Sequence, residues 1–319
     1  MGCKGSAVQI RPPRQQTARE ISGGFFYYTS GMLFRSSVND QQISTFLTCL
    51  LCLAFLTACS PQSTSSQSGW TRNEAIPLNP EEGVEISLNR AEVVLRGTSE
   101  SVLRIEASSS AGSADELIVE HQAGKVVIED RSSLRAEVGS ISLQIEIPYG
   151  QSVDVDVRGG VIALQNLRGS INVESISADI RAERIEGTIW ITNPRGEVHV
   201  HDSMGEIHVL GQAAGVRLVN LHGATFVSTI MGEIEFAGEP RDGDRIKIES
   251  DHGGVLLRLS PQTDADLILT SAGGQIICSF PGLNEVGRDC SASLNEGSAR
   301  IEVRTVSGAI RIASLLLEP

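Results

Sequence analysis

The chain has 319 residues, of which 40% are hydrophobic, 20% charged and 4% aromatic, with a formal net charge of −13 at pH 7. This composition predicts a folded protein rather than a disordered one. An acidic chain binds nucleic acid and anionic lipid surfaces poorly, so we expect no nucleic-acid partner. Residues 1–58 carry five Lys or Arg and two Asp or Glu, which leaves residues 59–319 with a net charge of −16.

The first segment of the chain, residues 1–31, shows no pattern of a helix or a strand. Met32 would be a suitable start for a conventional signal peptide. We therefore interpret residues 1–31 either as a start assigned too far upstream, and so not part of the native protein, or as a disordered extension.

An apolar run of about thirteen residues follows, from Phe46 to Ala58. As a helix it would be roughly 20 Å long, whereas a membrane-spanning helix needs about 20 residues. With Arg35 before it, the run has the length of the apolar region of a cleavable signal peptide, which we place at residues 32–58. The alternative is an apolar segment that happens to contain cysteine.

The apolar run ends in Leu56-Thr57-Ala58-Cys59, which resembles a lipobox, the cleavage motif of bacterial lipoproteins. The resemblance implies cleavage before Cys59 and lipidation of its thiol, with acyl chains such as palmitate as the membrane anchor. Ser60, in place of an Asp after the Cys, implies the outer membrane if the host is Gram-negative. Residues 59–73 are rich in Ser and Gln, which predicts a flexible tether behind the lipidated Cys.

Residues 74–158 predict an N-terminal β portion. Runs such as VEISL and SVDVDV alternate apolar and polar residues, as half-buried strands do. We expect this portion to close one end of a repetitive portion at residues 159–319, with residues 74–319 forming one continuous domain.

A repeat of about nine residues runs from Gly160 to Phe236. Most units begin with Gly and carry apolar residues at the second and fourth places after it, as Ile189 and Ile191 do. Short strands between tight turns give this pattern, and stacked copies would bury a continuous apolar column. We predict an all-β protein, a β-solenoid or β-roll with two or more strands in each coil. An antiparallel β-sandwich is the alternative, because alternation alone does not fix the pairing of strands.

Two stretches carry a resemblance to a known family. The run IEIPYGQSVDVDVRGG, which enters the repeated G-x-I-x-V units, and the closing GSARIEVRTVSGAIRI resemble the bacterial putative-adhesin family of domains of unknown function. These domains are toast-rack-like β-solenoids, and the resemblance covers roughly residues 84–313. It implies the solenoid fold and supplies no catalytic residues.

Three histidines are the candidates for a metal site. Alternation places His199 and His201 on the same outward face, and His208 occupies the matching place one unit later. A zinc site needs three or four ligands around one point, which two histidines on one strand do not supply. We therefore favour solvent-facing histidines and expect neither a metal nor another cofactor.

The remaining site candidates are an aromatic residue and two carboxylates. Trp190 occupies an outward place in its unit, where it could stack on a sugar or a partner, or be covered by a loop or by the N-terminal portion. Asp154 and Asp156 face the same side of one strand. Glycoside cleavage needs two carboxyl groups opposed across a substrate, so we interpret this pair as a solvated strand face.

Two cysteines remain beside Cys59 once a signal peptide is removed, Cys278 and Cys290. The residues between them are typical of a loop and both flanks are typical of strands. In an oxidising compartment we expect them to form a disulfide; the alternative is two independent core residues.

These features predict a non-catalytic, lipid-anchored protein of the cell envelope that presents a binding surface to an envelope protein or a surface polymer. One alternative is a polysaccharide lyase or hydrolase, which the acidic, aromatic-poor composition disfavours. Another is a structural protein whose edge strands pair with a second copy to give a homo-oligomer.

Overall fold

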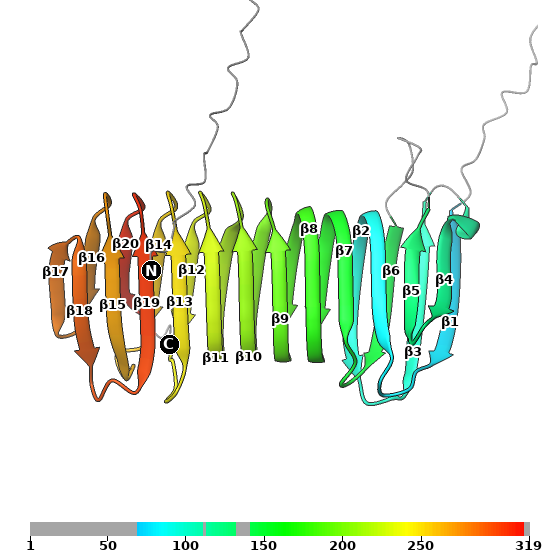
Figure 1. Cartoon of the computed structure of the whole chain (residues 1–319), viewed down its shortest axis with the longest axis horizontal. Helices are drawn as coiled ribbons and strands as arrows, with labels where there is room; N and C mark the ends of the chain where they lie inside the picture. The colour runs from blue at the N-terminus through cyan, green and yellow to red at the C-terminus, as the bar shows by residue number, and fades with distance from the viewer. Residues whose placement is uncertain (1–68, 111–112, 132–140, 316–319) are drawn as a thin grey trace, which may run out of the picture. The chain divides into compact units, whose positions relative to one another are not determined.

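The computed structural model describes residues 69–110, 113–131 and 141–315 (Figure 1). The predicted extension, the signal peptide, Cys59 and the first part of the tether lie outside these residues. Within the described segments the chain is almost entirely β, with one short 3-10 turn at η1 (Ala114–Glu116). No helix in this part of the chain has the length and apolar character needed to cross a membrane.

The strands follow one another in this order: β1 (Trp70–Pro77), β2 (Gly83–Thr98), β3 (Val102–Ser109), β4 (Leu117–Gln122), β5 (Lys125–Asp130), β6 (Ile141–Pro148), β7 (Val153–Gln165), β8 (Arg168–Glu183), β9 (Glu186–Asn193), β10 (Glu197–Gly211), β11 (Gly215–Thr229), β12 (Ile234–Gly238), β13 (Arg245–Ser250), β14 (Val255–Leu259), β15 (Ala265–Ser271), β16 (Ile276–Phe280), β17 (Leu283–Gly287), β18 (Asp289–Leu294), β19 (Ala299–Thr305) and β20 (Ile310–Ser314).

Each coil of the central part contains two of the nine-residue units. Parallel pairing advances by 18 residues at every step, so Val153 pairs with Ile171, and Ile171 in turn pairs with Ile189. Alternate units therefore lie in the same sheet, and neighbouring units lie in opposite sheets. The prediction of a β-solenoid is confirmed, with two strand segments in each coil, and the parallel pairing differs from that of an antiparallel sandwich.

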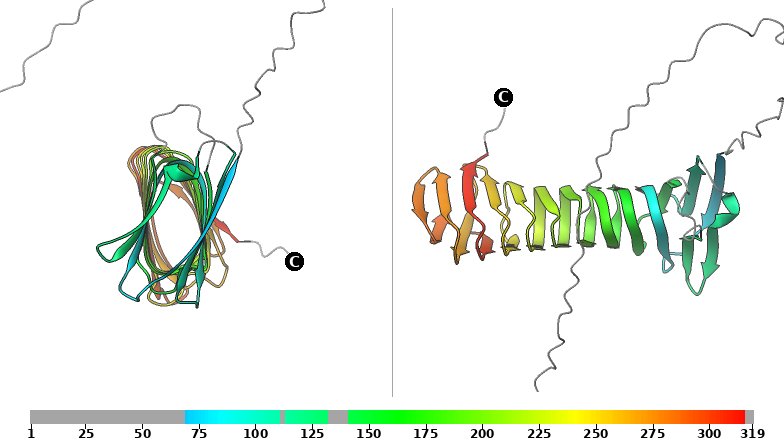
Figure 2. Two further views of the ribbon diagram at one scale, coloured as in Figure 1. Left: turned by 90° about the vertical axis from the view of Figure 1, so that its right-hand side faces the viewer. Right: turned by 90° about the horizontal axis from the view of Figure 1, so that it is seen from above.

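The coils form two facing sheets, which Figure 2 shows as two layers when the molecule is viewed along the stack. Sheet I consists of β4, β5, the first halves of β2, β7 and β8, then β9, the second halves of β10 and β11, and finally β13, β19, β15 and β18. Sheet II consists of β1, β3, β6, the second halves of β2, β7 and β8, the first halves of β10 and β11, then β12, β14, β20, β16 and β17.

The core lies between the two sheets and is built mainly from Val, Ile and Leu. Val173, Ile191 and Val209, which follow one another in register across sheet I, are at most 1% exposed. Branched side chains at alternate positions fill this narrow space without large rings, and each contributes about 1.5–3 kcal/mol by leaving water.

Glycine recurs at the turns because successive turns approach one another too closely for a side chain. At Gly205, with φ at 131°, a Cβ would lie 2.0 Å from the carbonyl oxygen of Gly187. Gly223 stands in the same relation to Gly205, at 2.3 Å. The period of the sequence thus records the stacking distance of the turns.

The opposite row of turns holds hydroxyl groups inside the fold. Thr229, Ser250 and Thr305 are buried, and each hydroxyl donates to the carbonyl three residues further along, at 3.2, 3.1 and 2.7 Å. These bonds satisfy turn carbonyls that water does not reach, so the polar residues stabilise the turns rather than form a site.

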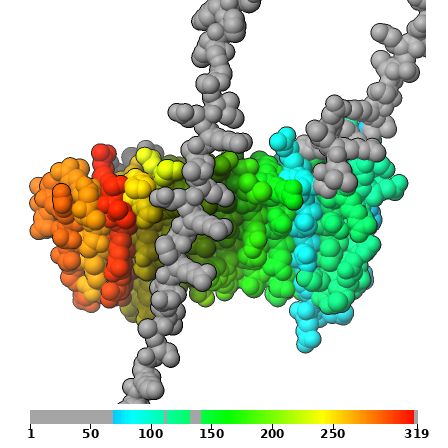
Figure 3. Space-filling model, turned by 45° about the horizontal axis from the view of Figure 1, so that its top comes forward, coloured from blue at the N-terminus to red at the C-terminus, as the bar shows by residue number. Residues whose placement is uncertain are grey.

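Both ends of the solenoid contain an inserted coil. β2 lies between β5 and β6 on one side and β7 on the other, although it precedes them all in the chain. The last coil, β19 and β20, lies between the coil of β13 and β14 and that of β15 and β16. Figure 3 shows the β2 band within the green region and the red β19 and β20 band beside the orange one.

The predicted N-terminal portion is only partly an end cap. β1, β3 and β4 close that end through antiparallel pairing, whereas β2 and β7 are coils of the stack itself. The predicted division between residues 158 and 159 falls inside β7, which continues without a break from sheet I into sheet II.

Candidate functional site

Outward side chains form rows along the solenoid, because equivalent places in successive coils lie side by side. The row that stands out on sheet I contains Trp190, His208 and Phe226, which pair in register on β9, β10 and β11. We call these three residues the aromatic row. Asn172 precedes it on β8 and Lys247 follows it on β13.

The rings of the aromatic row contact one another in the direction of the stack. Trp190 and His208 are parallel, with ring centroids 3.8 Å apart and an interplanar angle of 1°. Phe226 is tilted by 53° against His208 at 6.1 Å, and Lys247 Nζ lies 5.3 Å from the Phe226 centroid. Trp190 is 43% exposed, so the sequence expectation that another segment might cover it is wrong.

The three histidines proposed for a metal are not brought together. His199 and His201 lie in the half of β10 that belongs to sheet II, whereas His208 lies in the half that belongs to sheet I. The correction has a simple cause: neighbouring nine-residue units face opposite sides. Among the described residues no group of three or more His, Cys, Asp or Glu side chains could hold a metal ion.

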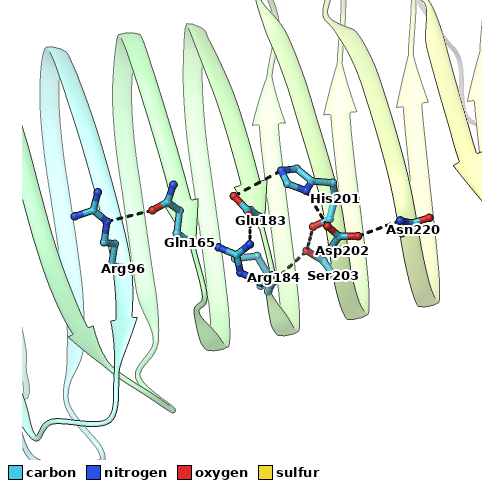
Figure 4. Close-up of polar contacts among 9 residues, drawn as sticks. Arg96, Gln165, Glu183, Arg184, His201, Asp202, Ser203 and Asn220 are labelled. Atoms are coloured by element: carbon cyan, nitrogen blue, oxygen red, sulfur yellow. Dashed lines mark hydrogen bonds and ion pairs between the residues drawn. The ribbon is translucent and has the colours of Figure 1, made fainter. Parts of the chain in front are cut away.

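His201 instead belongs to a polar network at a turn between the sheets (Figure 4). Its Nδ1 lies 3.3 Å from Asp202 Oδ2, and its Nε2 lies 3.8 Å from a carboxylate oxygen of Glu183. Asn220 donates to Asp202 Oδ1 at 3.1 Å. The hydrogen bond from Asn220, followed by that from His201, lowers the pKa of Asp202.

A groove of about 940 Å³ follows these turns. Arg184, Asp202 and Asn220 line it from successive coils, and the loop of residues 239–242 lines it as well. The buried carboxylate of Asp244 holds that loop, because it accepts from the backbone N–H groups of Gly223 and Arg241 at 2.7 Å each. The groove carries both signs of charge and few apolar groups, which gives it no marked preference for one ligand.

A smaller hollow of about 310 Å³ lies on sheet I beside the aromatic row. Asp154, Asp156, Asn172 and Glu174 line it, and the two aspartates are exposed, as expected of a solvated strand face. Since Asp154 and Asp156 are side by side on β7, they do not form the opposed pair that glycoside hydrolysis uses.

The two cysteines of the described part meet at the C-terminal end. Cys278 and Cys290 are both buried free thiols, and their sulfur atoms lie 3.0 Å apart. The structure thus places the predicted disulfide partners in contact, and the disulfide itself stays a prediction. Lipidation of Cys59 also stays a prediction.

Sequence reasoning missed the aromatic row and the groove. The row was detectable in principle, because residues 172, 190, 208 and 226 are separated by 18 residues, the length of a coil. The groove depends on the longer loop after β12, whose position along the turns no local pattern specifies.

Comparisons with known proteins follow the fold. Three solved structures are similar: a putative cell adhesion protein from Clostridium sporogenes ATCC 15579, with 11% identity over 78% of this chain and 100% of that one and a TM-score of 0.30; a putative adhesin from Parabacteroides distasonis ATCC 8503, with 9% identity over 77% and 98% and a TM-score of 0.45; and a putative lipid binding protein from the same organism, with 10% identity over 77% and 97% and a TM-score of 0.37.

No curated protein matches the chain. The sequence profile of the Toastrack DUF4097 family matches residues 82–313, which is nearly the whole of the solenoid. The matched segment runs from just before β2 to within β20 and so includes both inserted coils. The chain belongs to the Toastrack family, DUF4097.

Proposed function

We propose that this protein is a non-catalytic, adhesin-like lipoprotein of the cell envelope, whose solenoid presents outward rows of side chains to an envelope protein or a surface polymer. The observation that carries the proposal is the arrangement of these rows. Equivalent places repeat along the stack, so chemical groups are spread along a surface rather than gathered at one point, as extended binding surfaces of solenoids are.

The sequence before the fold supports the anchor. The lipobox-like ending at Cys59 and the tether behind it precede β1, which begins at Trp70. The chain from Cys59 to Trp70 spans at most about 40 Å when extended. A lipid on Cys59 would therefore hold the solenoid close to a membrane surface while leaving its long faces accessible.

Lipidation is tested by metabolic labelling of the full chain with an alkyne analogue of palmitate. We expect label and membrane fractionation for the natural sequence, and neither for Cys59→Ala. A labelled Cys59→Ala protein would contradict the anchor at this residue.

Binding is tested by affinity capture from envelope extract on immobilised protein, with varied salt and Ca²⁺. Retention of a defined protein or glycan supports the proposal, and retention of neither contradicts it. A polysaccharide-active enzyme would instead release reducing or unsaturated sugar ends from a panel of polymers, and light scattering on the free protein would reveal a homo-oligomer.

A further inference from the structure

We propose that the exposed face of Trp190 binds a pyranose ring of a neutral saccharide, with neighbouring sugars lying over the hollow beside it. The inference rests on the proposed function and names the ligand class for one surface of the solenoid. It is carried by the aromatic row, the hollow and the charge of the residues around them.

The two faces of the Trp190 ring have different surroundings. His208 covers one face, at 3.8 Å between centroids and with the rings parallel. The other face is turned toward β8, where the register neighbour is Asn172, a much smaller side chain. Since 43% of Trp190 is exposed, this second face offers an apolar plate to a ligand.

The ring is held in place before any ligand arrives. His208 Nε2 lies 2.8 Å from Glu206 Oε1, and the opposite side of the imidazole faces Phe226 at 6.1 Å. A side chain that is already ordered loses little conformational entropy on binding, which favours affinity. The stacked histidine thus acts as a support for the tryptophan.

The hollow adjoins the exposed face of Trp190. Asn172 lines the hollow and pairs with Trp190, and Glu174 lines it and pairs with Thr192 on the same strand as Trp190. Its volume of about 310 Å³ is at the lower end of small-molecule sites, which suits one or two sugar rings. Amide and carboxylate groups beside an aromatic plate can hydrogen-bond sugar hydroxyls while the C–H face of the ring stacks on the indole.

The charge of the hollow selects among saccharides. Four carboxylates line it, from Glu85, Asp154, Asp156 and Glu174, against one cation, Lys125, which forms an ion pair with Glu85. Uronate, sulfate or phosphate groups would be repelled there, so we assign the site to uncharged sugars. Coils about 4.8 Å apart repeat the same surface along the stack, which suits an extended chain of sugars.

The test uses the full chain in detergent and the Trp70→Phe background, in which Trp190 is the sole tryptophan. Cellohexaose, chitohexaose, xylohexaose and maltohexaose serve as neutral probes, and hexagalacturonate serves as the anionic one. We expect at least one neutral probe to change the Trp190 fluorescence in a saturable way, and hexagalacturonate to give no such change.

Calorimetry with the same probe then compares variants of the natural chain. We expect Trp190→Ala to weaken binding about tenfold, which is the loss of roughly one stacking interaction, and Trp190→Phe to restore part of it. Val286→Ala, at an exposed position 64% accessible at the C-terminal end, is the control and should bind as the natural chain does. Thermal unfolding checks that each variant is folded.

Three results would overturn the assignment: no neutral probe binds at millimolar concentration, a folded Trp190→Ala binds with unchanged affinity, or hexagalacturonate binds more tightly. If these occur while capture from envelope extract still retains a partner, the saccharide site is wrong and the proposed function stands. If capture also fails, both are wrong.

Discussion

The sulfur atoms of Cys278 and Cys290 lie 3.0 Å apart, although Cys278 belongs to β16 in sheet II and Cys290 to β18 in sheet I. The pair therefore joins the two sheets where β17 and β18 end the stack. Burial, and next the hydrogen bond with Cys290, raises the pKa of Cys278 to about 12.

In protein isolated from an oxidising envelope we expect a disulfide between these residues. Closing a loop of this length stabilises the fold by about 3 kcal/mol, so reduction should lower Tm by roughly 6–12 °C. Mass spectrometry with and without reduction identifies the bond. The double variant Cys278→Ser and Cys290→Ser should not respond to reductant, and equal masses before and after reduction would contradict the prediction.

The reduced protein should lose stability at alkaline pH through the same residues. Because the folded state raises the pKa of Cys278 from 9.0 to about 12, only the unfolded state releases the proton between these values. The free energy of unfolding therefore falls as the pH rises above 9, and the thiol resists alkylation at pH 8. The Cys278→Ser variant should show a smaller decline, and an equal decline would exclude Cys278 as the cause.

Adjacent glycines give a matched test of turn stacking. At Gly160, with φ at 122°, a Cβ would lie 2.0 Å from the carbonyl oxygen of Ala91, whereas at Gly159 the one neighbour within 4 Å is the Ser177 hydroxyl at 3.3 Å. We expect Gly160→Ala to cost more than about 3 kcal/mol and Gly159→Ala to change stability by less than about 1 kcal/mol. Urea unfolding measures both, and similar losses in the two variants would contradict the stacking argument.

Arg184 occupies a backbone position that suits other residues better. Its φ is 54°, in the left-handed region, as is that of the corresponding Asn166 and Asn220 in neighbouring coils. Asn adopts this conformation more readily, so Arg184→Asn should gain about 1 kcal/mol and raise Tm by roughly 2–4 °C. Arg181→Asn, on an exposed strand position, should bring no gain; an increase there as large as at Arg184 would point to charge instead.

The turn network predicts a change in the titration of one carboxylate. The hydrogen bond from Asn220, and then that from His201, lowers the pKa of Asp202 in the folded state. Its contribution to stability is therefore present above the pKa of the unfolded chain and is lost as the pH falls through the folded value.

Asn220→Gly keeps the left-handed backbone at φ 51° and removes the donor. We expect the pKa of Asp202, followed by carbon-13 NMR, to rise in this variant. Asn166→Gly is the control, because Asn166 contacts Tyr149 rather than Asp202. An unchanged Asp202 titration in Asn220→Gly would show that His201 dominates.

The sequence predicted the strands, the turns and the buried side of each unit, because alternation and glycine spacing are local signals. It could not assign units to sheets, since both sheets have the same pattern. This is why His208 was grouped with His199 and His201 although it faces the opposite side, and why its stack with Trp190 was missed.

The inserted coils were beyond prediction for a related reason. β2, β19 and β20 have the same alternation as their neighbours, so nothing local indicates that they lie between segments distant in the chain. Their places are set by which antiparallel strands cover the ends, and that is decided by the packing of the whole stack.

The inserted coils also determine how a protein of this architecture can change its length. Trimming either end of the folded chain would remove a layer from the interior of the stack and leave two unmatched surfaces, at β5 to β7 and at β13 to β16. Between β7 and β11, by contrast, 18 residues return the backbone to the equivalent place one layer further on. Relatives can therefore grow or shrink by whole multiples of this segment in the middle, while both termini act as fixed clasps.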